Sequence, residues 1–89
     1  MADADLPSVT FSNFVISLAS TAMVHLGAAP DPDTGARTTD LPMAIHTIDA
    51  LGMLEEKTRN NLDADEQKLI ASVLAELRTK FVEASRARK

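Results

Sequence analysis

The chain has 89 residues and a formal net charge of −4, with 13 acidic against 9 basic residues. It contains no cysteine, which excludes disulfide bonds and thiolate chemistry, and its acidic balance argues against nonspecific nucleic-acid binding by the whole domain. A domain of this size buries only about 60–65 % of its unfolded surface, so oligomerisation is a common source of added stability.

The first nine residues, MADADLPSV, are small, polar and acidic, and they predict a disordered lead over residues 1–9. Their acidic character also argues against a secretory signal, which begins with basic residues. A first helix is predicted over residues 10–27. Ser8 or Thr10 can cap its start, and Gly27 can end it because glycine adopts a left-handed conformation without steric cost.

This first helix has no charged side chain from Phe11 to Leu26. A helix without a charged face is usually buried on more than one side. We expect it to pack in a homo-oligomer interface formed by Phe11, Phe14, Val15, Ile16, Leu18, Ala19, Ala22, Met23 and Leu26. A bilayer is the alternative environment, but the run is short, contains several hydroxyl groups and lacks a basic flank and an aromatic belt.

Residues 28–39 predict a long loop, because proline, aspartate and glycine alternate along it. Its candidate partner-facing residues are Pro30, Asp31, Asp33 and Gly35. The spacing of the two aspartates and the glycine is similar to the start of a calcium loop. The twelfth position, where such a loop needs a bidentate glutamate, is Pro42. A turn held by aspartate hydrogen bonds is therefore favoured, and no metal site is predicted.

The second helix is predicted over residues 41–59, with Asp40 as its N-cap and Pro42 in its first turn. Its apolar stripe consists of Leu41, Ala44, Ile45, Ile48 and Leu51. Gly52 lies on this stripe. Because a glycine inside a helix costs about 1 kcal/mol against alanine, its presence predicts a close helix crossing.

The third helix is predicted over residues 63–86, where Asp63 and Glu66 have the spacing of a capping box. Its apolar stripe consists of Leu69, Ile70, Val73, Leu74, Leu77 and Phe81. The short turn before it predicts an antiparallel hairpin with the second helix. The sequence therefore predicts an all-α fold, with one domain over residues 10–86 and a basic tail over residues 87–89.

No arrangement of residues predicts catalysis or cofactor binding. His25 and His46 lie on different predicted helices, whereas a helical metal motif places two histidines one turn apart. Glu55 and Glu56 are adjacent, so they point about 100° apart and do not converge on one substrate. The sequence also lacks a serine nucleophile motif and a phosphate-binding glycine loop. We expect no catalytic residue, no metal, no cofactor and no enzyme activity.

Three segments, FSNFVISLASTAMVHLGAAPDPDTG, AIHTIDALGMLEEKTRNNLDADE and LIASVLAELRTKFVEAS, carry a family resemblance. The most distinctive parts are SLAS with HLG at residues 17–27, Pro30-Asp31 with Gly35, and LGMLEEKT at residues 51–58. Together these segments resemble a family of small bacterial proteins known as domain of unknown function 1844. The resemblance implies a small, helical, cytoplasmic bacterial protein, and it brings no established activity or catalytic residue.

The function expected from these features is that of a non-enzymatic, homo-oligomeric interaction module, with a dimer as the simplest assembly. It would act in the cytoplasm as an adaptor or regulator for another protein. The alternative is a protein associated with a membrane surface or with nucleic acid through the uncharged first helix or the basic C-terminal stretch. The basic residues of that stretch are Arg78, Lys80, Arg86, Arg88 and Lys89. A steep salt dependence of liposome or RNA binding would favour the alternative.

Overall fold

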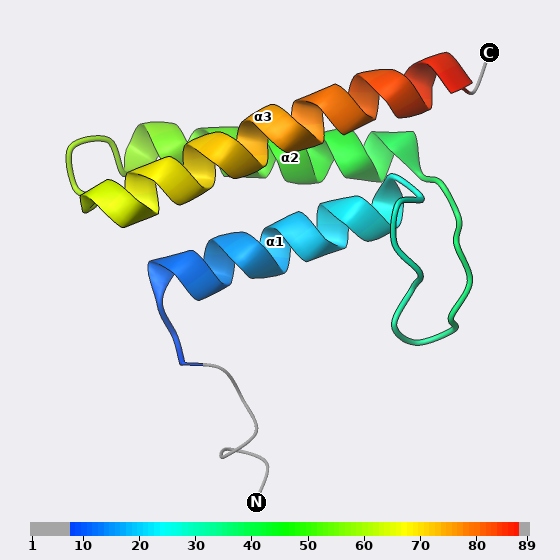
Figure 1. Cartoon of the computed structure of the whole chain (residues 1–89), viewed down its shortest axis with the longest axis horizontal. Helices are drawn as coiled ribbons and strands as arrows, with labels where there is room; N and C mark the ends of the chain where they lie inside the picture. The colour runs from blue at the N-terminus through cyan, green and yellow to red at the C-terminus, as the bar shows by residue number, and fades with distance from the viewer. Residues whose placement is uncertain (1–7, 88–89) are drawn as a thin grey trace, which may run out of the picture.

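The structure is a computed structural model that describes residues 8–87 of the chain. Within this range the chain forms three α-helices and no strand: α1 (Phe11–His25), α2 (Leu41–Lys57) and α3 (Ala64–Ala87) (Figure 1). The all-α prediction is confirmed, and each helix begins and ends within two residues of its predicted bounds. The predicted disordered lead and basic tail lie mostly outside the described residues.

The two ends of α1 follow from local hydrogen bonding and backbone geometry. Thr10, rather than Ser8, is the N-cap, because its Oγ1 accepts a hydrogen bond from the backbone N–H of Asn13 at 3.0 Å. At the other end Leu26 is the C-cap, and Gly27 follows with a φ of +77°. Gly27 therefore ends the helix in the left-handed conformation that its sequence position predicts.

The caps of α2 and α3 confirm the sequence predictions. Asp40 accepts a hydrogen bond from the N–H of Met43 at 3.1 Å, and Pro42 lies in the first turn of α2, where a missing N–H costs nothing. The N–H of Glu66 donates to the carboxylate of Asp63 at 2.8 Å, and the N–H of Asp63 donates to that of Glu66 at 3.0 Å. This reciprocal pair is the capping box expected at the start of α3.

A short turn reverses the chain between α2 and α3. Asn60 has a φ of +71°, a left-handed conformation that asparagine tolerates better than most residues. The N–H of Asn61 donates to the carbonyl of Thr58 at 2.9 Å and closes the turn. As a result α2 and α3 run antiparallel as a hairpin, as predicted, and α1 packs against both of them (Figure 1).

One hydrophobic core joins all three helices. Each helix contributes residues spaced three, four or seven positions apart, so that they lie along one face. The buried apolar residues are Val15, Ala22, Leu26, Ala44, Ile48, Leu51, Ile70, Leu74 and Leu77. The single chain therefore already covers the inner face of α1. None of these three helices has the length and apolar character needed to cross a bilayer.

Candidate functional site

The structure narrows the predicted oligomer interface on α1. Three of its residues belong to the core of the single chain: Val15, Ala22 and Leu26. Four are half-buried against that core: Phe11, Leu18, Ala19 and Met23. Phe14 and Ile16 remain 53 % and 49 % exposed. The inner side of the charge-free helix is thus covered by α2 and α3, and an interface between copies stays a prediction for the residues left at the surface.

The two exposed apolar residues of α1 lie on opposite flanks of the helix, because a separation of two residues corresponds to a rotation of about 200°. Ile16 lies on the flank next to α3, where it lines a hollow together with Val73 and Leu77. Phe14 therefore lies on the other flank of α1, away from α3. A single surface contact on one flank would cover only one of these two residues.

The hollow on the α3 side is a groove of about 250 Å³ between two helices. We call it the α1–α3 groove, and it is lined by Ile16, Ala19, Ser20 and Met23 of α1 and by Val73, Glu76 and Leu77 of α3. Most of these side chains are apolar, and only Glu76 carries a charge. Such a groove is suited to the apolar side of a helix.

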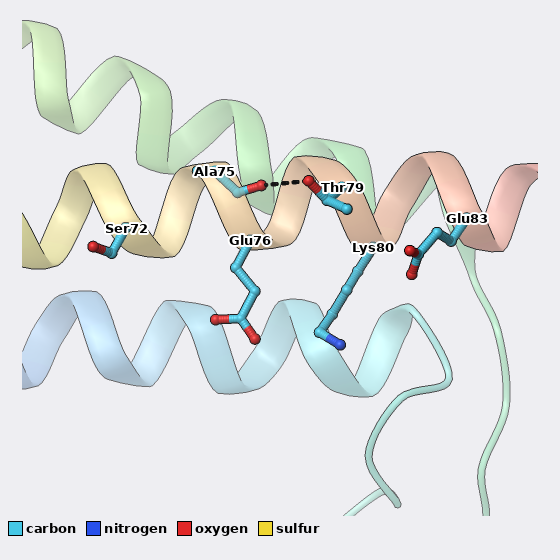
Figure 2. A pocket seen from close by; sticks show the side chains of 6 residues that line it. All are labelled: Ser72, Ala75, Glu76, Thr79, Lys80 and Glu83. Atoms are coloured by element: carbon cyan, nitrogen blue, oxygen red, sulfur yellow. Dashed lines mark hydrogen bonds between the residues drawn. The ribbon is translucent and has the colours of Figure 1, made fainter.

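A wider and more open hollow of about 520 Å³ lies along the outer side of α3. We call it the α3 hollow, and it is lined by Ser72, Ala75, Glu76, Thr79, Lys80 and Glu83 (Figure 2). Glu76 lines both hollows, so the two form one continuous surface. The hydroxyl of Thr79 donates to the carbonyl of Ala75 at 3.0 Å, so this polar group is already satisfied within its own helix (Figure 2).

The loop between α1 and α2 forms the predicted aspartate turn. The carboxylate of Asp31 accepts hydrogen bonds from the N–H groups of Asp33 at 2.7 Å and Thr34 at 3.3 Å. Gly35 has a φ of +74°, and its N–H donates to the carbonyl of Asp31 at 2.7 Å. Pro30 is exposed beside this turn. The four loop residues thus form a compact surface turn, and their contact with a partner stays a prediction.

This turn lies near the end of α1 and encloses a third hollow of about 260 Å³ with it. Its polar lining comes from Ser20, Thr21, His25, Asp31 and Asp33. Within residues 8–87, no group of three or more His, Asp or Glu side chains has an arrangement that could hold a metal ion. The carboxylate of Asp31 also accepts two backbone N–H groups, which gives it a structural role in the turn.

Gly52 lies next to α3, on the side of α2 that faces Arg78. The nearest atom to the position that a Cβ would take is Nη2 of Arg78, at 3.3 Å. The close neighbour of this glycine is thus the end of a long side chain, whereas the sequence predicted only that a helix would cross nearby. Arg78 was missed because its position on α3 predicts solvent exposure and gives no sign of the contact.

Replacing Gly52 with alanine should therefore stabilise the protein by about 0.5–1 kcal/mol. Alanine favours the helical conformation, and the flexible side chain of Arg78 can move by the few tenths of an ångström that a methyl group requires. Urea unfolding followed by circular dichroism would measure the change. A destabilisation above about 1 kcal/mol would instead show that Arg78 is held rigidly against α2.

The fold and these hollows define a small all-α protein with surface hollows along α3, between α1 and α3, and between α1 and the loop that follows it. The chain belongs to the family described as Domain of unknown function (DUF1844), whose model matches residues 8–83 and so covers α1, α2 and most of α3. The resemblance found in the sequence is thereby confirmed. No curated protein and no solved structure matches the chain.

Proposed function

We propose that the protein is a non-enzymatic interaction module that forms a homo-oligomer in the cytoplasm and serves as an adaptor or regulator for another protein. The observation that supports this best is the α1–α3 groove, where apolar side chains of two helices border a concave surface. Ile16 is half exposed at this groove, so a docked helix would remove apolar surface from water.

The arrangement of the polar groups also favours binding over catalysis. The charged residues of the α3 hollow, Glu76, Lys80 and Glu83, lie on a single helix and border an open hollow on the protein surface. General acid–base catalysis is most effective where two groups converge on one substrate and water is excluded. Charged groups on an open surface are better suited to steering and orienting a partner.

Three further apolar side chains remain available to a second partner. Met43 and Met53 are exposed on α2, and Phe14 is exposed on the flank of α1 that lies away from α3. Methionine adapts its shape to different partners because its side chain is unbranched and polarizable. A homo-oligomer formed through the α1–α3 groove would leave these residues accessible, as an adaptor requires.

The proposal predicts a solution mass of twice the 9.6 kDa of the single chain. Light scattering over a dilution series without detergent would measure it. A mass of one chain at every concentration would contradict the homo-oligomer. Binding to anionic liposomes or RNA that weakens steeply with salt would favour the membrane-associated or nucleic-acid-associated alternative.

A further inference from the structure

The charges beside the α1–α3 groove follow a simple pattern. The α1 wall carries no formal charge, because this helix contains no acidic or basic residue other than His25 at its end. The α3 wall and the adjoining α3 hollow carry Glu76, Lys80 and Glu83, whose signs alternate. Figure 2 shows Glu76 and Lys80 extending from α3 in the direction of α1. A uniformly acidic or uniformly basic helix would meet at least one like charge at this surface.

We propose that a second copy of this chain docks here, with its own α3 antiparallel to the first. This inference rests on the proposed function and names its partner and contact surface. In a two-fold dimer whose axis passes α3 at the level of Arg78, residue 76 of each copy lies opposite residue 80 of the other. Glu76 then faces Lys80 of the second copy, and the same pair forms again on the other side of the axis.

The shape of the surface fits this contact. The outer side of α3 carries Ser72, Ala75 and Thr79, whose short side chains allow another helix to come close. The incoming helix would lie along the α3 hollow and cover the edge of the α1–α3 groove, including Ile16. Close packing of the two helices and burial of Ala75 and the exposed part of Ile16 would stabilise the dimer, while the two charge pairs would set its antiparallel register.

Charge reversal tests this arrangement. Glu76→Lys and Lys80→Glu each replace two attractive pairs by two repulsive pairs, so each should raise the dissociation constant of the dimer at least about tenfold. The double variant, Glu76→Lys with Lys80→Glu, restores opposite charges and should return the constant to within about threefold of the wild-type value. Glu56→Lys is the matched control, because it makes the same change at an exposed position of α2 away from the groove.

The mass of each variant would be measured over the same dilution series, with circular dichroism to show that the helices remain folded. A wild-type protein that is monomeric throughout would overturn both the homo-oligomer and this inference. A wild-type dimer that Glu76→Lys weakens no more than Glu56→Lys does would overturn the inference alone. The inference would also be overturned if the double variant kept its helical content but its dissociation constant stayed as high as that of the single variants.

The absence of cysteine allows a second, geometric test, since one introduced cysteine provides a unique site for a spin label. Val82 and Ala71 are exposed positions of α3 outside the α3 hollow, and they lie four and seven residues from the proposed axis. At 1.5 Å per residue, the two labels at position 82 should be separated by about 12 Å along the helix, and those at position 71 by about 21 Å. Equal distances at the two positions would indicate parallel helices and overturn the proposed register.

Discussion

Ala22→Glu is expected to unfold the protein rather than merely dissociate an oligomer. Ala22 is completely buried in the core shared by the three helices. A glutamate there must either bury an unpaired carboxylate or push α1 away from the other helices, and it also overfills the site. The expected loss is about 4 kcal/mol or more, which is most of the stability of a domain of this size.

Far-UV circular dichroism and urea unfolding would measure this effect. Ser17→Glu is the matched control, because it adds the same side chain to the exposed side of the same helix. It should change the free energy of unfolding by no more than about 0.5 kcal/mol. If Ala22→Glu kept the helicity and the unfolding midpoint of the wild type and only lost its oligomeric mass, α1 would contact another copy instead of its own core.

The secondary structure could be predicted from the sequence because its signals are local. Asp40, Asp63 with Glu66, and Gly27 act within one turn of their own helix, and the structure shows each in its predicted role. The apolar stripes also identified the core faces of α2 and α3. Such signals depend only on helical periodicity and on the hydrogen-bonding needs of helix ends.

The surroundings of α1 could not be predicted in the same way. Periodicity indicates that Val15 and Ala22 are buried, but it does not indicate whether the covering surface belongs to the same chain or to another copy. The structure shows that α2 and α3 cover them. The outer side of α1 carries exposed hydroxyl residues such as Ser17 and Thr21, and these can be hydrated without any charge.

The candidate site depends on tertiary contacts that the sequence does not display. The α1–α3 groove brings Ile16 and Met23 next to Val73 and Leu77, which are more than 45 positions further along the chain. Each of the two apolar rows was visible by itself, but their juxtaposition depends on how the helices cross. For the same reason, the alternating charges of α3 can be assigned to a contact surface only once the position of the groove beside them is known.

Gly27→Ala should be the most disruptive of the three possible glycine-to-alanine substitutions. Gly27 has a φ of +77°, and an added Cβ would lie 2.5 Å from Oγ1 of Thr39. The backbone strain alone costs about 1–2 kcal/mol, and displacing Thr39 adds to it, so we expect a total loss of about 2–3 kcal/mol. The substitution also disturbs the segment where the N–H of Asp40 donates to the carbonyl of His25 at 2.7 Å and joins the ends of α1 and α2.

Gly35→Ala measures the cost of the left-handed backbone without the steric clash that occurs at Gly27. Gly35 has a similar φ of +74°, but nothing lies within 4 Å of the position of its Cβ. This variant should therefore lose only about 1 kcal/mol of unfolding free energy, measured by urea unfolding.

Thr39→Ala removes the oxygen that the added methyl group would meet. In the Gly27→Ala background it should restore the stability by the difference between the two glycine variants. Equal losses for Gly27→Ala and Gly35→Ala would contradict the contact with Thr39, and a Gly27→Ala variant as stable as the wild type would contradict the left-handed end of α1. The free energy of unfolding should therefore be lowest for Gly27→Ala, intermediate for Gly35→Ala and highest for Gly52→Ala. This order follows from the backbone angle and the local space alone, since the substitution is the same at all three positions.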